Sequence, residues 1–378
     1  MNDAPAADIS SEPVSLAEIA LLFLKLGTIA FGGPAAHIAM MEEEFVRRRR
    51  WISHQEFLDR LGASNLIPGP SSTELAIHIG YSKRGWRGLL VAGCCFIVPA
   101  AILVGLIAAA YVRYGSLPRV EHILYAIKPV VIAVILQALW NLGRTAVKSA
   151  WLAVIGVGAV VVYFFNAHEL VLLAVTGLAA AIPALARSRR AMLLLLPPIA
   201  AAAVQPAPFG LTRLFLTFLK IGSVLFGSGY VLLAFLRSDF VDRLGWLTEK
   251  QLLDAVAVGQ VTPGPVFTTA TFIGYLVGRG RGAAVATVAV FLPAFILVAA
   301  SGPLLPKIRR SPVAAAFLDG VVVGSLALIV VVAWQLGRAA IVDVTTASIA
   351  VVSTILLFRF RVNSAWLVLG AAAIGLAL

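Results

Sequence analysis

A few polar residues stand inside long apolar runs of this 378-residue chain, and several of them occur twice at matching places. Lys25 and Lys220 share the context Phe-Leu-Lys-(Leu/Ile)-Gly. A lysine inside such a run is costly to bury, so it either faces an anion or extends its ammonium to a polar boundary. We predict that both lysines face an anion site, with extension to the boundary as the competing interpretation.

Acidic residues and histidines in the same runs are candidates for proton coupling. Asp59 and Asp254 occupy matching places, and each could carry a proton or pair with one of the two lysines. A carboxylate on a helix surface that faces water is an equal alternative. His37 and His78 have no histidine counterpart in the second copy, and they also are coupling candidates, although a lone histidine is more often structural.

Each copy also contains two places where a helix must break. The glycine break is Phe31-Gly32-Gly33-Pro34 in the first copy and Phe226-Gly227-Ser228-Gly229 in the second. The Pro-Gly-Pro break is Pro68-Gly69-Pro70 and then Pro263-Gly264-Pro265. Proline removes a backbone donor and glycine permits positive φ, so these sequences free backbone groups that need protein, water or a substrate as partners. The alternative is that the breaks only let helices kink and pack.

The residues around the Pro-Gly-Pro breaks suit an oxyanion. Ser71 and Glu74 have capping-box spacing, which predicts a helix start after Pro70. A helix N-terminus offers free N–H donors and a partial positive charge. The predicted substrate-binding set is Lys25, Gly32, Gly33, Asn65, Pro68, Gly69, Pro70, Ser71, Ser72, Lys220, Gly227, Gln260, Pro263, Gly264, Pro265, Thr268 and Thr269.

Composition identifies the elements that hold these residues as membrane helices. Hydrophobic residues make up 60% of the chain, charged residues only 13%, and the mean hydropathy is +0.96. The bilayer is the solvent that suits such a sequence. The net charge of +12 comes from short Lys/Arg clusters between apolar runs, which indicates membrane topology and argues against nucleic-acid binding. The polar, slightly acidic first 13 residues do not resemble a signal peptide, so we expect the first apolar run to stay in the membrane.

The apolar runs fall into two related halves. Residues 23–70 align with 218–265 at a shift of 195, with 16 identities in 48 positions. A shift of 194 then pairs Ile79-Gly80-Tyr81 with Ile273-Gly274-Tyr275. We predict a repeat over 1–205 and another over 206–378. Thirteen apolar segments are expected, near 16–33, 57–80, 88–112, 122–143, 149–165, 169–186, 191–204, 211–233, 252–276, 282–302, 313–335, 340–357 and 363–378.

Because seven segments precede the second half, an odd number of crossings inverts it relative to the first. Inverted repeats are typical of secondary transporters. The preferred interpretation makes 14–49 and 54–82 re-entrant hairpins whose tips are the two breaks, with 209–243 and 249–278 entering from the other side. Kinked helices that cross the whole membrane are the alternative, and they keep the inversion. The fold prediction is thus an all-α polytopic membrane protein with two inverted halves.

No enzyme constellation is visible. The chain has no phosphate-binding loop, HExxH or nucleophile elbow, so we expect no enzyme activity, no metal and no cofactor. The adjacent Cys94 and Cys95 fit small core residues. Any pumping must then run on an ion gradient or on the membrane potential.

The motifs together resemble the chromate ion transporter family in its long, two-domain form. The resemblance rests on FGGPAAH (31–37), EEFV (43–46), LIPGPSS (66–72) and IGY (79–81). In the second half it rests on FG (226–227), DFV (239–241), VTPGP (261–265) and IGY (273–275). The second half departs from the first at Ser228-Gly229, where the first copy has Gly33-Pro34.

The resemblance implies export of chromate, a tetrahedral dianion similar to sulfate, across the bacterial cytoplasmic (inner) membrane, with chromate resistance as the result. Uptake of sulfate or another oxyanion is an alternative, and so is an oxyanion-conducting channel. The expected partners are the small oxyanion and the lipid bilayer, and nucleic acid is not expected. Whether the chain forms a homodimer is left open by the sequence.

Overall fold

The computed structural model of the chain describes residues 14–31, 33–115, 117–165, 167–187, 209–226, 229–309 and 311–377. Every regular element in these ranges is a helix, so the all-α prediction is confirmed for them. The expected segment 191–204 lies outside the described residues, as do Gly32 and Gly227.

The first half opens with helices that are interrupted at both predicted breaks. They are α1 (Leu16–Ile29), α2 (Gly33–Glu42), the π-helix η1 (Glu43–Arg48), α3 (His54–Ser64) and α4 (Ser71–Tyr114). The side chains of Ser15 and Ser53 accept the first free N–H groups of α1 and α3. An ion pair of 2.7 Å joins Glu18 in α1 to Arg49 just after η1, so the two ends of this segment lie together.

The second half repeats this order. It contains α8 (Leu211–Val224), the 3-10 turn η2 (Gly229–Val231), α9 (Leu232–Leu236), the π-helix η3 (Arg237–Arg243), α10 (Glu249–Val261), the 3-10 turn η4 (Val266–Thr268) and α11 (Thr269–Arg309). A capping box between Thr248 and Gln251 starts α10. Phe209 ahead of α8 stacks edge-on against Trp246 ahead of α10, with ring centroids 5.3 Å apart.

Both long helices α4 and α11 reverse direction at corresponding places. The helical path of α4 is broken at Arg84 and Gly85, where φ of Gly85 is +53°. In α11 the break falls at Gly278 and Arg279, where φ of Arg279 is +55°. Beyond each turn the two arms pack backbone to backbone, because a Cβ on Gly88 would collide with the Gly80 carbonyl, and one on Gly282 with the Gly274 carbonyl.

The other helices complete a multi-pass membrane protein. They are α5 (Pro118–Ala146), α6 (Ala150–Phe164), α7 (Glu169–Arg187), α12 (Pro312–Ala340), α13 (Val344–Arg359) and α14 (Ser364–Ala377). Among the described residues, five helices are long and apolar enough to cross a membrane, in α4, α5, α7, α11 and α12, and α6, α13 and α14 are shorter apolar helices.

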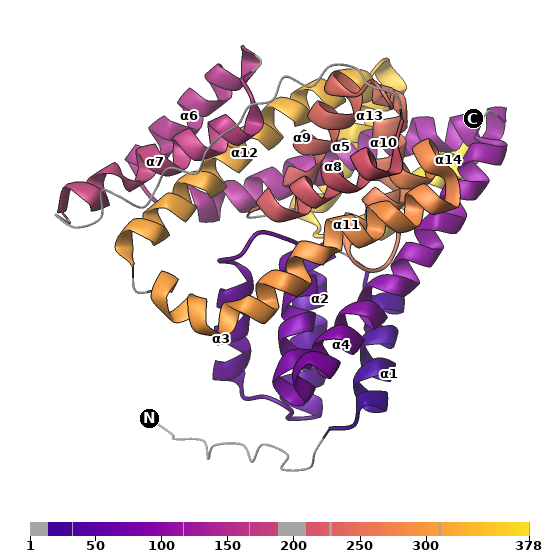
Figure 1. Cartoon of the computed structure of the whole chain (residues 1–378). Coiled ribbons are helices and arrows are strands. Elements are labelled where there is room, and N and C mark those ends of the chain that lie inside the picture. The colour runs from indigo at the N-terminus through magenta and orange to yellow at the C-terminus, as the bar shows by residue number, and fades with distance from the viewer. Residues whose placement is uncertain are drawn as a thin grey trace.

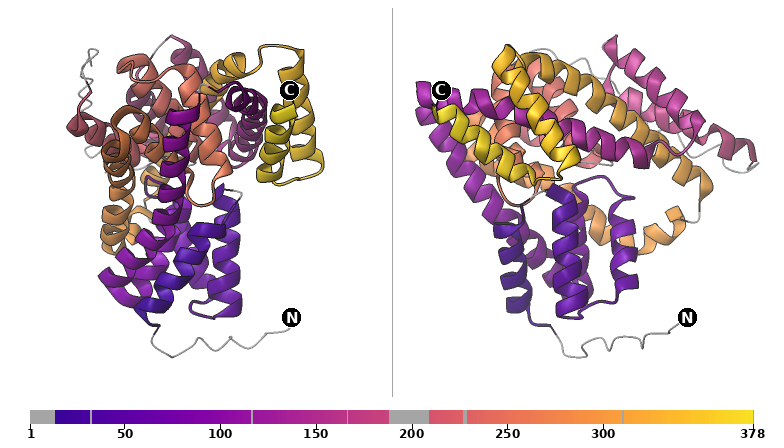
Figure 2. Two further views of the ribbon diagram at one scale, coloured as in Figure 1. Left: turned by 90° about the vertical axis from the view of Figure 1, so that its right-hand side faces the viewer. Right: turned by 180° about the vertical axis from the view of Figure 1, so that it is seen from behind.

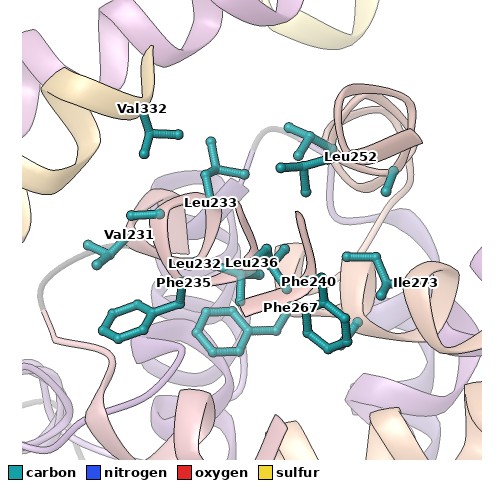
Figure 3. Packing of buried hydrophobic residues seen from close by; sticks show 14 of the residues in the cluster. Val231, Leu232, Leu233, Phe235, Leu236, Phe240, Leu252, Phe267, Ile273 and Val332 are labelled. Atoms are coloured by element: carbon teal, nitrogen blue, oxygen red, sulfur yellow. The ribbon is translucent and has the colours of Figure 1, made fainter. Parts of the chain in front are cut away.

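The two sets of short helices lie at different ends of the molecule. Figure 1 shows α1, α2 and α3 at one end, α8, α9 and α10 toward the other, and α11 between them; Figure 2 shows this arrangement from two other sides. The second set is the better buried. Val231, Leu233 and Phe235 from η2 and α9 lie in an apolar core with Phe267 and Val332, as Figure 3 shows.

Candidate functional site

Two backbone hydrogen bonds join the breaks of one half to the breaks of the other. The N–H of Gly69 donates to the carbonyl of Leu225, at 2.7 Å, and the N–H of Gly264 donates to the carbonyl of Ala30, at 3.0 Å. Each Pro-Gly-Pro break therefore bonds to the residue just before the opposite glycine break. The two bonds correspond to one another under the shift of 195 found in the sequence.

The central glycines of these breaks have backbone conformations that other residues rarely adopt. Gly69 has a φ of +142° and Gly264 a φ of +93°. A Cβ on Gly264 would stand 2.6 Å from the Cβ of Ala100 in α4 and 3.1 Å from the carbonyl oxygen of Gly27 in α1. Glycine is thus required at Gly264 both by conformation and by space.

His37 ties the first glycine break to the start of α4. Its Nε2 lies 3.0 Å from the Ala30 carbonyl oxygen, and its Nδ1 lies 3.2 Å from the Ser72 hydroxyl. With Nε2 as the donor, Nδ1 accepts from Ser72, so a neutral imidazole satisfies both bonds. The Ala30 carbonyl accepts from His37 and from Gly264 together. His37, one of the proton-coupling candidates, is therefore part of a buried hydrogen-bond network with Ser72, Ala30 and Gly264.

Glu74 lies directly over the first Pro-Gly-Pro break. Its carboxyl is fully buried and so close to Gly69 that a Cβ there would collide with Oε1. Among the described residues, neither oxygen has a hydrogen-bond partner, and the Thr73 hydroxyl and Nε2 of His78 also have none. The predicted helix start after Pro70 is confirmed, because α4 begins at Ser71, but Pro70 is the N-cap and no side chain caps the helix, so the capping box does not form. Sequence reasoning did not identify Glu74 as a buried carboxyl that lies against the break. The available signal was a difference between the two copies, because Thr269 takes the place of Glu74 in the second copy.

At the second Pro-Gly-Pro break, the hydroxyl groups form hydrogen bonds to nearby backbone carbonyls. The hydroxyls of Thr268 and Thr269 donate to the carbonyls of Pro265 and Val266, both at 2.8 Å. Gln260 accepts from Tyr230 at 3.3 Å, and its Nε2 is buried without a partner in the described part of the chain. The two matching breaks therefore differ, with free polar groups over the first and self-bonded hydroxyls over the second.

The paired lysines lie away from the breaks, beside acids of the two π-helices. Lys220 forms an ion pair of 2.6 Å with Asp239 in η3, and Arg243 contacts the same carboxylate at 3.2 Å. Lys25 is exposed, and its charge acts on Glu44 in η1. Because Glu44 matches Asp239 in the repeat, the lysines neighbour equivalent acids.

Charge compensation at the first of these π-helices lowers the pKa of one carboxyl. Burial by itself would raise the pKa of the Glu44 carboxyl, but the hydrogen bond from Arg49 and nearby cations, Lys25 among them, bring it below its ordinary value.

Asp254 and Asp59 have different surroundings. Asp254 is fully buried in α10, where Lys128 of α5 lies 3.1 Å from Oδ1 and the Tyr111 hydroxyl donates to Oδ2 at 2.8 Å. Asp59 is exposed on α3. Lys128, which the sequence presents only as a polar residue near a helix start, also lines a cavity of about 570 Å³ with Tyr125 and Lys250.

The remaining predicted residues lie near the breaks with fewer contacts. Asn65 is the exposed C-cap of α3, and Gly33 begins α2 with a φ of +74° and open space around it. Ser71 is half-buried at the start of α4. The first half thus brings Ser72, His37 and the Pro-Gly-Pro break together, whereas the lysines and Asp254 belong to separate clusters.

The fold and this buried junction of broken helices define a multi-pass helical membrane protein. The sequence model of one family, described as "Chromate transporter", matches residues 17–182 and 212–376. The chain therefore belongs to the chromate transporter family.

Individual relatives agree with this assignment. The chain is 33% identical to a chromate transport protein of Cupriavidus metallidurans, over 98% of this chain and 95% of that one. It is 32% identical to a probable chromate transport protein of Synechococcus elongatus, over 90% and 89% of the two chains. An uncharacterized transporter of Bacillus subtilis, YwrA, is 28% identical and matches 39% of this chain but 85% of its own length. No solved structure matches.

Proposed function

We propose that this protein is a secondary transporter that exports chromate, or a related tetrahedral oxyanion, across the bacterial cytoplasmic membrane and so confers chromate resistance. The observation that carries this proposal is the pair of crossed hydrogen bonds between the breaks. Helix breaks inside a membrane are tolerated where they line a binding site, and transporters place substrates at such breaks.

An inverted arrangement of the two halves is part of this proposal. In our proposal, α1 with α2 and α3 with the first arm of α4 are re-entrant hairpins that enter from the cytoplasmic side, and their counterparts enter from the opposite side. The ends of the first hairpins lie together, because Lys83 bonds to the Trp51 carbonyl and Arg84 to the Val14 carbonyl. The breaks then meet between the two sets.

The proposed substrate site comprises the two Pro-Gly-Pro breaks and the polar residues that follow them. A chromate dianion only accepts hydrogen bonds, and the uncapped N-terminus of α4 supplies donors and a partial positive charge. In our proposal Lys25 and Lys220, at the π-helices, attract the anion toward the breaks. Motion of the hairpins against each other would expose the site to one side at a time.

The membrane potential favours this direction of transport. Each elementary charge gains about 2.3 kcal/mol per 100 mV, so a dianion that leaves a negative interior gains about twice that amount. Export therefore needs little further coupling.

Growth of a chromate-sensitive bacterium with and without this gene tests the proposal when cell-associated chromate is measured in parallel. We expect resistance together with lower cell chromate, and saturable chromate uptake by everted vesicles. Higher cell chromate would indicate uptake, and transport that neither saturates nor shows trans-stimulation would indicate a channel. Either outcome would contradict the proposal.

A further inference from the structure

Three buried polar groups on the first two turns of α4 have no hydrogen-bond partner among the residues that the structure describes. They are the carboxyl of Glu74, the hydroxyl of Thr73 and Nε2 of His78. Glu74 is fully buried and touches the Pro-Gly-Pro backbone at Gly69, and His78 is one helical turn further along α4. Because buried polar groups are normally hydrogen-bonded, three unpaired groups at one helix end indicate a ligand that would satisfy them.

No positive charge compensates Glu74 in the described part of the chain. His37 on α2 directs one ring nitrogen to Ala30 and the other to Ser72, and Arg60 on α3 is paired with Glu56 at 2.6 Å. On α11, the residue nearest to Gly69 is the apolar Ala294. Leu225, just after α8, faces Gly69 with its backbone carbonyl. An ionised carboxylate without a partner is costly there, so the buried site suits a neutral, protonated carboxyl.

A protonated carboxyl changes what this helix end can bind. An ionised Glu74 would repel an oxyanion, whereas the protonated acid donates a hydrogen bond to it. Nε2 of His78, which lies four residues further along α4 and therefore on the same side of the helix, can donate to the same anion. Glu74 and His78 therefore form a set of donors only while Glu74 carries a proton.

We propose that Glu74, in its protonated form, is a substrate-binding residue, so that the oxyanion and one proton are bound together at the first Pro-Gly-Pro break. This inference rests on the proposed function and adds a co-transported proton to it, so the complex that leaves carries one net negative charge and gains half as much from the membrane potential as the dianion alone. The proton comes from the solution on the side where the anion enters, stays on the Glu74 carboxyl during occupancy, and leaves when the anion has left. The second half lacks this group, because Thr269 stands in the matching place.

Sulfate binding to the purified protein in detergent, measured over neutral to alkaline pH, tests this inference. Sulfate is the better probe, because it stays a dianion in this range while chromate itself takes up a proton near neutral pH. We expect the wild-type affinity to fall by up to about tenfold per pH unit once Glu74 ionises. Glu74→Gln, which keeps a donor and cannot ionise, should bind with an affinity that varies little with pH.

Controls separate Glu74 from other titrating groups. Glu121→Gln, at an exposed carboxylate, should keep the wild-type pH profile. His37→Gln and His78→Gln should keep a fall in affinity at alkaline pH. The inference is overturned if Glu74→Gln keeps that fall, or if either histidine variant abolishes it.

A second measurement does not depend on any variant. Sulfate added to wild-type protein in a weakly buffered alkaline solution should cause uptake of up to about one proton per protein. Binding without proton uptake throughout that range would contradict the inference. If sulfate does not bind, chromate is used in the alkaline range where it is a dianion. Failure of both anions to bind would count against the proposed function itself.

Discussion

The buried charged residues of this protein are of two kinds. Asp239 and Asp254 are neutralised by lysines, at 2.6 and 3.1 Å, and lie at a distance from the breaks along their helices. Glu74 has no such partner in the described ranges of the chain, and it lies on a break. Paired charges are expected to hold helices together, whereas the unpaired carboxyl has polar capacity left for a ligand.

Sequence patterns identified the breaks better than the roles of single side chains. Gly69 and Gly264 were predictable, because glycine between two prolines has few other uses within an apolar run. The partner of a charge was not predictable, because Lys128 and Asp254 are 126 positions apart and meet only through the packing of α5 on α10. A pairing of Asp254 with Lys25 or Lys220 was one of the alternatives left open by the sequence; in the structure Asp254 contacts Lys128, and Lys220 contacts Asp239.

Replacing Gly264 by alanine should abolish chromate transport. The positive φ costs an alanine about 1–2 kcal/mol, and the added Cβ would press on Ala100. Both effects displace the N–H that bonds to Ala30. Transport into everted vesicles measures the loss, and Gly370→Ala, where nothing lies within 4 Å, is the matched control. Normal transport by Gly264→Ala would show that this backbone geometry is not needed.

The two halves repeat the same order of helices, and the irregular helices are repeated as well. Each half has a π-helix that carries an acid and an arginine four residues later, Glu44 with Arg48 and Asp239 with Arg243. Each half also has a long helix that reverses direction, at Arg84 and Gly85 in α4 and at Gly278 and Arg279 in α11. The gaps between apolar segments at 81–87 and 277–281 indicated an interruption there. The tight reversal was not predictable, because it depends on the backbone contact of Gly80 with Gly88.

Lys128 and Asp254 should stabilise the protein only when both are present. Asp254→Leu or Lys128→Met alone should lower stability by about 3–5 kcal/mol, because each leaves one buried charge uncompensated. The double variant should recover most of that loss. Thermal unfolding of the detergent-solubilised protein measures this, with Lys148→Met, whose pair with Asp319 is exposed, as a control of small effect. Equal losses in single and double variants would refute the coupling.

At the scale of the whole molecule, the halves are interleaved. The crossed hydrogen bonds join the breaks, and α14 packs on α5 so closely that a Cβ on Gly375 would stand 2.7 Å from the Cα of Ile123. In the same way, a Cβ on Gly320 in α12 would stand 2.8 Å from the Cα of Gly177 in α7. The duplication was evident from sequence, but this exchange of contacts between halves was not, since related halves can also fold side by side as separate units.

Neither half should therefore fold alone. Residues 1–205 and 206–378 produced separately should be degraded or aggregate, because each exposes apolar helix faces and lacks partners for its breaks. Produced together in one cell, they should copurify and restore chromate resistance. A tagged half that is stable and monodisperse without its partner would contradict this expectation, and the intact chain with the same tag is the control.

The contact at the centre of the molecule involves main-chain atoms only, N–H groups of Gly69 and Gly264 and carbonyls of Leu225 and Ala30. Nearly every residue type carries these atoms, so after the ancestral gene duplicated, side chains around the contact were free to change without loss of the bonds. Selection had only to retain two glycines. In the present sequence one copy has His37 and Glu74 where the other has Leu232 and Thr269. A backbone joint of this kind allows a symmetric ancestor to evolve an asymmetric site.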